Sequence, residues 1–327
     1  MLPDGTAPLS RDAAETAFAA ILDGAASPDA VRAFLAALTT RDETAEEIAA
    51  AARAMRARML GVVAPEAAID VCGTGGDGQH SLNISTAVSI VVAAAGVPMA
   101  KHGNRAASSK AGAADTLEAL GVRLDRTAGE SEALLGEIGI AFFFAPAHHP
   151  ALGALASIRR AIGRRTIFNL LGPLANPARV RRQLIGLARP DYVPTYAAAA
   201  AELGYRRALI ASGEEGLDEI SIAGPSRLAW VEGRTVREDR VSPEDAGLPR
   251  HPLDAIRGGD ASHNAAALRR LLAGEAGAYR DAVLLNAAGA LMVAGAVDGW
   301  REGVEEAAEV IDRGLAKALL DCWIAHP

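Results

Sequence analysis

The sequence predicts an α/β fold in which a mostly parallel sheet is flanked by helices and preceded by a small, all-helical N-terminal domain. From Ile69 onward, short apolar runs alternate with polar loops and helix-length segments, which is typical of a parallel sheet covered on both faces. Before that point the pattern is helical throughout. With 327 residues, half of them apolar, the chain can bury a sizeable core in one large domain or two smaller ones.

The first 62 residues carry helix signals. Ser27 and Pro28 form an N-cap and first-turn pair, and apolar residues follow at helical spacing. Thr44 and Glu47 have the spacing of a capping box. We expect a small helical domain over 1–65, which helices around 150–180 can join, and a larger α/β domain over 66–327. The helical part carries no candidate chemistry, and its packing surface can serve a dimer.

Strand and helix signals alternate in the rest of the chain. We expect strands at 69–72, 97–100, 140–145, 183–188, 208–211 and 220–223, followed by a hairpin over 228–236. We expect helices at 84–95, near 116–119 and 129–137, at 152–162 and 194–203, and several between Gly breaks over 262–324. Gly172, Pro173 and Pro177 mark a rigid turn between two elements.

The composition excludes several classes of protein. A net charge of −7 argues against a general binder of nucleic acid or membrane surfaces. Two distant cysteines, Cys72 and Cys322, form neither a disulfide framework nor a zinc site. The start MLPDGT lacks the pattern of a signal peptide, and the apolar run 88–100 is too short to span a membrane. We expect a cytoplasmic protein that binds small molecules.

Two loops rich in Gly, Ser and Asn follow neighbouring predicted strands, and such loops form a crevice at the edge of an α/β sheet. The first, Gly73–Gly78, reads GTGGDG and is called the glycine loop below; glycines bring backbone N–H groups against phosphate oxygens. Asn83, Ser85 and Thr86 follow at a helix start, which favours an anion. A structural turn and ordinary helix capping are the alternatives.

The second loop, Lys101–Lys110, reads KHGNRAASSK and combines charges with directional donors, which suits a diphosphate. The adjacent pair Asp218-Glu219 favours Mg²⁺ beside a phosphate site, with a plain surface loop as the alternative. Four arginines over 159–165 include a candidate for bidentate recognition of a carboxylate. The pair His148-His149 lacks metal-ligand spacing and is interpreted as lining a loop or pocket.

Together these segments resemble the anthranilate phosphoribosyltransferases, tryptophan-pathway members of a superfamily related to the nucleoside phosphorylases. GTGGDG, NIST, KHGNR, FAPAHHP, TIFNLLGPLANP and GLDEIS stand in the family order, as do the later GGDA and LLNAAGAL. The resemblance covers nearly the whole chain. It implies transfer of the phosphoribosyl group of phosphoribosyl pyrophosphate (PRPP) to the amine of anthranilate, with release of pyrophosphate, in tryptophan biosynthesis.

The resemblance also implies roles for individual residues. PRPP would be bound by Gly73, Gly76, Asp77, Ser81, Asn83, Ser85, Thr86, Lys101, Asn104, Arg105, Ser108, Ser109 and Ala113. Anthranilate would be bound by Gly73, His102, Asn104, Arg159 and Pro173. Lys101, His102 and Arg159 would take part in catalysis, with His102 as a candidate to accept or relay the proton lost from the amine. Ser85, Asp218 and Glu219 would be ligands of Mg²⁺, with two ions per monomer.

The resemblance further implies a homodimer formed through the helical part and allows association with an anthranilate synthase component. The chain departs from the family pattern at Ala106, Ala111 and Ala113, where serine is common. Up to three hydroxyl donors are therefore missing from the pyrophosphate side, and backbone N–H groups can replace them.

Two other functions stay open at this point. A pyrimidine nucleoside phosphorylase-like enzyme shares the architecture and uses free phosphate instead of pyrophosphate, but the acidic pair and the KHGN segment favour the transferase. A nucleic-acid-binding paralogue of the same fold would need a basic groove, which a net charge of −7 disfavours.

Overall fold

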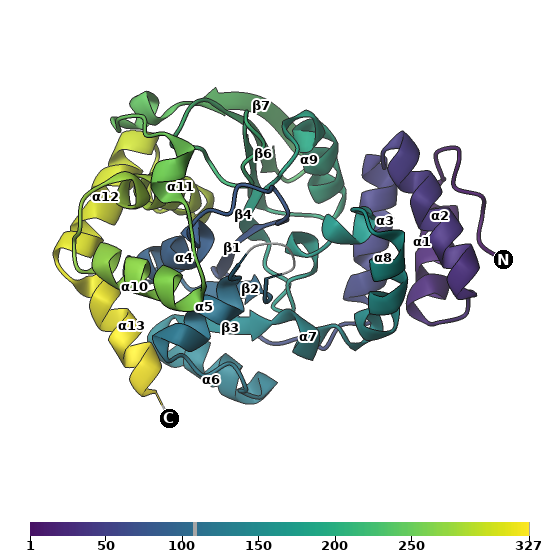
Figure 1. Cartoon of the computed structure of the whole chain (residues 1–327), viewed down its shortest axis with the longest axis horizontal. Helices are drawn as coiled ribbons and strands as arrows, with labels where there is room; N and C mark the ends of the chain where they lie inside the picture. The colour runs from purple at the N-terminus through teal and green to yellow at the C-terminus, as the bar shows by residue number, and fades with distance from the viewer. Residues whose placement is uncertain (107–109, 327) are drawn as a thin grey trace.

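The computed structural model of the chain describes residues 1–106 and 110–326. Its strands are β1 (Ile69–Gly73), β2 (Met99–Gly103), β3 (Ile140–Phe144), β4 (Arg182–Gly186), β5 (Arg207–Gly213), β6 (Ser226–Glu232) and β7 (Thr235–Val241). They form one sheet in the order β3-β2-β1-β4-β5-β6-β7 (Figure 1). The first five strands of that order are parallel, and β6 and β7 form an antiparallel hairpin at one edge. The predicted mostly parallel sheet and its hairpin are confirmed.

Alternating side chains divide the interior into two cores, one on each face of the sheet. Leu184 of β4 and Leu209 of β5 belong to the first core, whereas their neighbours Ile185 and Ile210 belong to the second. This alternation follows from the period of two along a strand. Apolar residues at adjacent positions of these central strands are expected for a sheet buried on both faces.

Among the described residues, seven helices cover the first core. They are α4 (Ile84–Ala94), α5 (Ala113–Leu120), α6 (Ala128–Ile138), α10 (Ala261–Leu272), α11 (Ala278–Ala294), α12 (Trp300–Asp312) and α13 (Leu315–Ala325). Helix α4 packs against β1 and β2 on one side and against α11 and α13 on the other. Its sequence has no charged residue, which allows it to be buried nearly all round.

The second core joins the N-terminal helices to the sheet. α1 (Arg11–Leu22), α2 (Pro28–Arg41) and α3 (Ala45–Arg56) form a bundle, and α3 packs against α9 (Val193–Glu202), which covers β5 and β6 (Figure 1). The predicted caps are confirmed: Ser27 caps α2 with Pro28 in its first turn, and Thr44 forms a capping box with Glu47.

The segment after β3 packs with this bundle. It contains α7 (Ala145–His148) and α8 (Ala156–Ile162), with 3₁₀ helices at Pro150–Leu155, Ile167–Asn169 and Pro173–Ala175. Further 3₁₀ helices lie at Pro190–Tyr192, Pro243–Ala246 and Leu253–Ile256. Leu155, Phe168 and Leu171 are buried in the second core, and α8 lies against α2 (Figure 1).

Three expectations need correction. Residues 220–223 are a largely buried irregular segment and no strand, because the Asn286 side chain takes both backbone groups of Ile220 and replaces a strand partner. The helix expected at 152–162 begins only at Ala156, since Pro150 and Gly153 favour a 3₁₀ start. The strand expected at 97–100 begins at Met99 and extends to Gly103. None of the described helices is long and apolar enough to cross a membrane.

Candidate active site

Four of the parallel strands end in glycine at the same edge of the sheet. β1 ends at Gly73, β2 at Gly103, β4 at Gly186 and β5 at Gly213, and Gly73 pairs with Gly186 across the ladder. Because the carboxyl ends of parallel strands meet at one edge, the loops that follow these strands lie together, where open α/β sheets bind ligands. This edge is the candidate active site.

The loop that carries Asp218 crosses directly over two of these glycines. A Cβ built on Gly186 would lie 1.7 Å from the Asp218 carbonyl oxygen, and one built on Gly73 would lie 2.3 Å from Asp218 Oδ2. Neither strand end has room for a side chain, so glycine lets the acidic loop lie against the sheet. The Gly75 N–H donates to Asp218 Oδ2 at 2.6 Å and joins the glycine loop to the acidic loop.

Glu219, next in the chain, faces the N-terminus of α4. Its Oε1 accepts the Ser85 N–H at 3.2 Å. Lys101 is buried at the end of β2, where its Nζ donates to the Val71 carbonyl at 2.6 Å and lies 3.4 Å from Ser85 Oγ. A hydroxyl, an ammonium and two carboxylates from distant parts of the chain thus meet at the strand ends.

The carboxyl groups at this edge are half-buried and lie close to one another. Burial raises the pKa of Asp218, and the neighbouring Asp77 carboxylate raises it further. Burial likewise raises the pKa of Glu219, with the charge of Asp218 as the next cause. Asp77 Oδ2 is buried and has no hydrogen-bond partner among the described residues. A cation bound here would relieve the repulsion between these groups.

The donor set fits Mg²⁺. The carboxylates of Asp218 and Glu219 and the hydroxyl of Ser85 are hard oxygen donors, and Mg²⁺ commonly takes one or two carboxylates together with waters and substrate phosphates. Residues 1–106 and 110–326 contain no group of three or more His, Cys, Asp and Glu side chains that could hold a metal by themselves.

The loop after β2 is organised by Asp115, at the start of α5. Asp115 Oδ2 accepts the N–H groups of Ala106 and Gly112, both at 2.9 Å. Arg105 pairs with Asp115 Oδ1 at 3.0 Å and with Glu118 Oε1 at 2.7 Å. The Arg105 guanidinium therefore faces α5 in this structure, and its contact with PRPP stays a prediction.

The other predicted residues of this loop have varied surroundings. Asn104 is exposed, and its Oδ1 accepts the Arg105 N–H at 2.7 Å. Ala113 lies against the end of β2, since a Cβ built on Gly103 would be 3.3 Å from the Ala113 Cβ. The predicted ligands Ser108 and Ser109 lie outside the described residues.

The Asn83 side chain connects three helices. Its Oδ1 accepts from Asn264 Nδ2 at 2.8 Å and from the Thr116 hydroxyl, and its Nδ2 donates to the Ala111 carbonyl at 3.4 Å. The side chain makes no capping hydrogen bond to α4. In this structure Asn83 holds α4, α5 and α10 together, so a contact with PRPP would need its amide to share these bonds.

Two further predicted PRPP residues flank Asn83. Ser81 forms an isolated antiparallel bridge with Arg257, which ties this segment to the start of the GGDA motif. Thr86 lies in the first turn of α4, and its buried hydroxyl has no hydrogen-bond partner within the part of the chain that the structure describes.

His102 follows Lys101 at the end of β2. Its Nδ1–H donates to the Gly172 carbonyl at 3.2 Å, which leaves Nε2 buried and without a partner among the described residues. Burial and the nearby His149 and His148 lower the pKa of His102 to about 3. His102 is therefore neutral at pH 7 and a weak base.

Arg159 is half-buried in α8, with its guanidinium 6.0 Å from the centre of the Phe168 ring. Burial lowers its pKa. No described carboxylate pairs with Arg159, whereas many arginines of the chain have an acidic partner. Pro173 is buried at the start of a 3₁₀ helix, in the turn that also supplies the carbonyl for His102.

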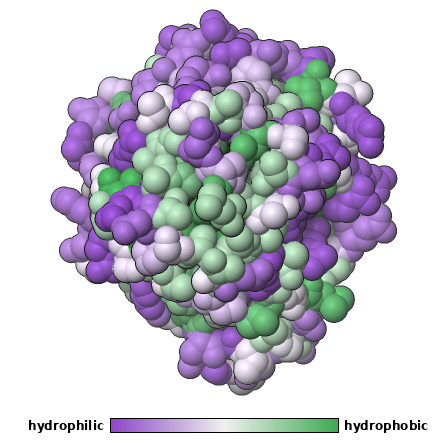
Figure 2. Space-filling view, turned by 90° about the vertical axis from the view of Figure 1, so that its right-hand side faces the viewer, coloured by the Kyte–Doolittle hydropathy of each residue, from purple (hydrophilic) through white to green (hydrophobic). Residues whose placement is uncertain are grey.

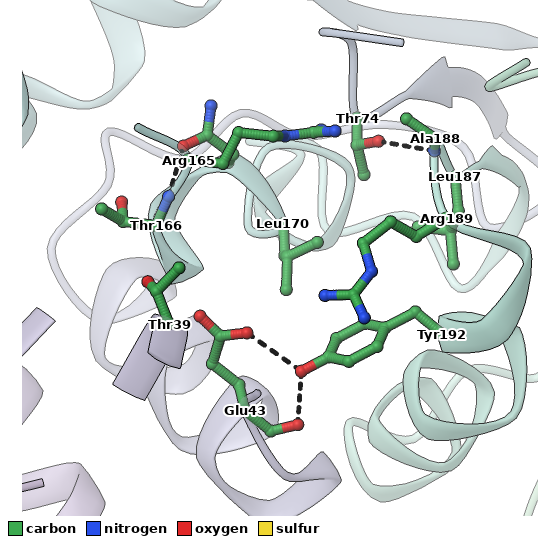
Figure 3. Close-up of a pocket in the computed structure, with 11 residues that line it drawn as sticks. Thr39, Glu43, Thr74, Arg165, Thr166, Leu170, Leu187, Ala188, Arg189 and Tyr192 are labelled. Atoms are coloured by element: carbon green, nitrogen blue, oxygen red, sulfur yellow. Dashed lines mark hydrogen bonds between the residues drawn. The ribbon is translucent and has the colours of Figure 1, made fainter. Parts of the chain in front are cut away.

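A pocket lies between the helical bundle and the strand-end loops (Figure 3). It encloses roughly 420 Å³, including space open to solvent. Leu170, Leu187 and Tyr192 provide apolar walls, and the Tyr192 hydroxyl donates to Glu43 Oε2 at 2.9 Å. The pocket borders the glycine loop at Thr74.

Comparisons with known proteins match this architecture along the whole chain. The family model described as the glycosyl transferase family, a/b domain, matches residues 65–317, and the model of its helical bundle domain matches residues 2–59. Curated anthranilate phosphoribosyltransferases from Novosphingobium aromaticivorans and Sphingopyxis alaskensis are 64% and 63% identical, over 99% of this chain and 98% of each relative.

The chain belongs to the anthranilate phosphoribosyltransferase family.

Solved structures of the family agree. The enzyme from Thermus thermophilus superposes with a TM-score of 0.93 at 42% identity, over 98% of this chain and 96% of that one. The enzyme from Saccharomyces cerevisiae, in complex with PRPP and Mg, gives a TM-score of 0.87 at 30% identity, over 97% and 93% of the chains. The family resemblance predicted from the motifs is confirmed.

The sequence motifs did not reveal Asp70, which is fully buried in β1. Its Oδ1 accepts the His102 N–H at 3.2 Å, and its Oδ2 accepts from Asn176 Nδ2 at 2.9 Å and Gln183 Nε2 at 3.1 Å. The sequence does contain a signal for Asp70, namely an acidic residue between Ile69 and Val71 inside an otherwise apolar strand. A carboxylate buried at such a position needs hydrogen-bond donors around it.

Proposed function

We propose that this chain transfers the phosphoribosyl group of PRPP to the amine of anthranilate, giving N-(5-phosphoribosyl)anthranilate and pyrophosphate in tryptophan biosynthesis. The observation that carries the proposal is the meeting of Ser85, Lys101, Asp218 and Glu219 at the strand ends. Curated relatives with this activity in their names, 64% and 63% identical over 99% of the chain, support it.

Mg²⁺ is the proposed cofactor, with Asp218, Glu219 and Ser85 as its protein ligands. When bound, Mg²⁺ would neutralise charge on the pyrophosphate as it leaves. Two ions per monomer are part of this proposal, as the family resemblance implies, with Ser85 as a hydroxyl ligand of the second ion. The PRPP and Mg complex of the yeast relative supports this choice of metal.

The chain's own residues would act mainly by positioning and by stabilising charge. As the bond between ribose C1 and pyrophosphate breaks, the ribose develops oxocarbenium character and the amine of anthranilate attacks C1. The buried Lys101 and the N–H groups of the glycine loop would stabilise the negative charge on pyrophosphate. An aromatic amine is neutral at pH 7, so its attack needs no strong base. The proton that the nitrogen loses after the bond to C1 forms would pass to water, directly or relayed by His102. The low pKa of His102 agrees with a positioning role for this residue rather than strong base catalysis.

The acceptor would bind between the loop after β2 and α8. Arg159 has no acidic partner among the described residues and is free to recognise the anthranilate carboxylate, as its planar guanidinium suits bidentate contact. Asn104 is exposed in the proposed site, and Gly73, His102 and Pro173 would shape the path to ribose C1.

We propose a homodimer formed through the helical bundle. Figure 2 shows the face of the molecule that carries this bundle, where a broad pale-green area is bordered by purple, hydrophilic residues. Exposed alanines on α2 and α8, among them Ala33 and Ala156, contribute apolar surface in this part of the fold. The same proposal includes a division into a helical domain over 1–65 and an α/β domain over 66–327. It also includes a cytoplasmic location and an association with an anthranilate synthase component.

The loss of anthranilate fluorescence tests the function directly. We expect the signal to fall only when PRPP and Mg²⁺ are both present, and a chelator to stop the reaction. Phosphorolysis of thymidine or uridine, with no loss of anthranilate, would instead identify a nucleoside phosphorylase. DNA binding without PRPP turnover would identify a nucleic-acid-binding paralogue.

A further inference from the structure

Arg165 follows α8 in the segment that packs with the helical bundle, yet its side chain ends on the glycine loop of the α/β domain. Its Nη2 donates to the Gly75 carbonyl at 2.6 Å, and its Nη1 lies 3.4 Å from the Gly76 carbonyl. Figure 3 shows the side chain extended along the edge of the pocket toward Thr74. No described carboxylate forms an ion pair with Arg165, and the hydrogen bonds of its side chain go to these two carbonyls.

The backbone of the glycine loop makes this contact directional. Gly75 and Gly76 have φ values of 71° and 72°, a left-handed conformation that side chains disfavour. A Cβ built on Gly76 would lie 3.5 Å from Arg165 Cζ, so the guanidinium rests close against the turn. Both peptide groups are trans, and in a trans peptide the carbonyl and the next N–H point in opposite directions.

Two N–H groups are consequently turned away from Arg165. When the carbonyls of Gly75 and Gly76 face the guanidinium, the N–H groups of Gly76 and Asp77 face the opposite side. Neither N–H has a hydrogen-bond partner in the described ranges, although the adjacent Gly75 N–H is bound to Asp218. Two free backbone donors next to each other in one loop are suited to receive oxygen atoms of an anion.

We propose that Arg165 is a positioning residue for PRPP: by holding two carbonyls of the glycine loop, it directs the Gly76 and Asp77 N–H groups toward the pyrophosphate. This inference rests on the proposed function. Donors fixed before the reaction stabilise developing charge at no cost in reorganisation. The planar fork of a guanidinium reaches two carbonyls at once, whereas the ammonium of lysine is a single point charge.

The neighbouring Arg164 provides a matched control. Its Nη2 donates to the Ala36 carbonyl at 2.9 Å and to Thr40 Oγ1 at 3.1 Å, both in α2. Arg164 therefore carries the same charge as Arg165 and lies in the same segment, but its side chain binds the helical bundle rather than the glycine loop.

The test compares Arg165→Ala, Arg165→Lys and Arg164→Ala with the wild type in steady-state kinetics and in calorimetric titration with PRPP and Mg²⁺. We expect Arg165→Ala to raise the KM and Kd for PRPP about tenfold or more, because charge-assisted hydrogen bonds are lost. The KM for anthranilate should change less than about twofold. Arg165→Lys should recover little of the loss, and added guanidinium at concentrations below those that unfold the protein should rescue Arg165→Ala. Arg164→Ala should bind PRPP like the wild type.

Several results would overturn the inference. The first is a KM for PRPP in Arg165→Ala that matches the wild type, and the second is an equal rise in the KM values for PRPP and anthranilate. The third is full recovery of PRPP binding in Arg165→Lys, which would show that only the positive charge is needed. If Arg165→Ala does not fold, the KM and Kd for PRPP are compared instead between Arg165→Gln, Arg165→Lys and the wild type. A wild-type protein that does not consume anthranilate with PRPP would overturn the proposed function itself, and the inference with it.

Discussion

At the scale of single residues, three charged side chains of the candidate site form no ion pair with any described residue. Arg159 lies half-buried without an acidic partner among the described residues, and Asp218 and Glu219 are half-buried next to each other. Such arrangements cost folding free energy and are retained where a ligand supplies the opposite charge. A carboxylate for Arg159 and a divalent cation for the acidic pair are the ligands that the proposed reaction provides.

The Arg159 assignment predicts a selective effect on the acceptor. Substituting Arg159 by Ala should raise the KM for anthranilate by about tenfold to a hundredfold, because a charge-assisted contact with its carboxylate is lost. The KM for PRPP should change little, and steady-state kinetics with each substrate varied in turn measures both. Equal rises in the two KM values would remove the carboxylate role from Arg159.

The buried histidines predict a loss of stability in mild acid. Burial lowers the pKa of His149 to about 4, below that of a histidine in the unfolded chain. Between about pH 6.5 and 4 the unfolded state therefore binds more protons, and the free energy of unfolding should fall as the pH is lowered, by up to about 1.4 kcal/mol per pH unit for this histidine.

Urea unfolding across this pH range measures the effect. The slope should be smaller in His149→Gln and unchanged in His263→Gln, which alters an exposed histidine. If His149→Gln keeps the wild-type slope, other groups are responsible for the acid sensitivity.

At the scale of elements, the site depends on glycines at strand ends that admit the acidic loop. The expected outcome for Gly186→Ala is a large loss of turnover and of stability, because its Cβ would lie 1.7 Å from the Asp218 carbonyl oxygen. Gly136→Ala in α6 is the control, since nothing lies within 4 Å of its Cβ position. It should stabilise the fold by about 0.5–1 kcal/mol, as alanine favours a helix. Thermal unfolding and turnover of the two variants test this contrast, and an active, stable Gly186→Ala protein would contradict it.

Local patterns predicted most elements, whereas contacts between distant segments were not predictable. The capping box of Thr44 and the glycine loop depend on neighbours in the sequence, and both could be predicted from it. The ion pairs of Arg105 with α5 depend on how a loop folds back. The segment at Ile220 resembles a strand in its composition, but Asn286, far along the chain, supplies its hydrogen bonds. Arg165 reaches the glycine loop across roughly ninety residues of sequence, a distance at which a pattern carries no information.

At the scale of the whole molecule, a buried hydrogen-bond network joins the helical bundle to the site. Arg56 of α3 donates to the Tyr205 hydroxyl at 3.1 Å, and that hydroxyl donates to Gln183 Oε1 at 2.9 Å. Gln183 Nε2 donates to Asp70, which in turn accepts the N–H of His102. The position of the bundle is thereby coupled to the end of β2.

Removing the hydroxyl that lies in the middle of this network should destabilise the protein. We expect Tyr205→Phe to lower the free energy of unfolding by about 1–3 kcal/mol, because a buried Gln183 oxygen loses its donor. Tyr196→Phe, whose hydroxyl donates to the Leu170 carbonyl, should cost less. Urea denaturation of both variants provides the comparison, and equal stability of Tyr205→Phe and wild type would show that the network contributes nothing.

The Mg²⁺ dependence of turnover tests most directly whether the strand-end edge is the active site. Initial rates of anthranilate consumption would be measured against Mg²⁺ concentration for the wild type and for the double variant Asp218→Asn with Glu219→Gln. We predict a saturable dependence in the wild type that a chelator abolishes. In the variant the half-saturating Mg²⁺ concentration should be higher by at least about tenfold, because both carboxylate ligands are lost. The same Mg²⁺ dependence in both proteins would contradict the assignment of this edge as the site of catalysis.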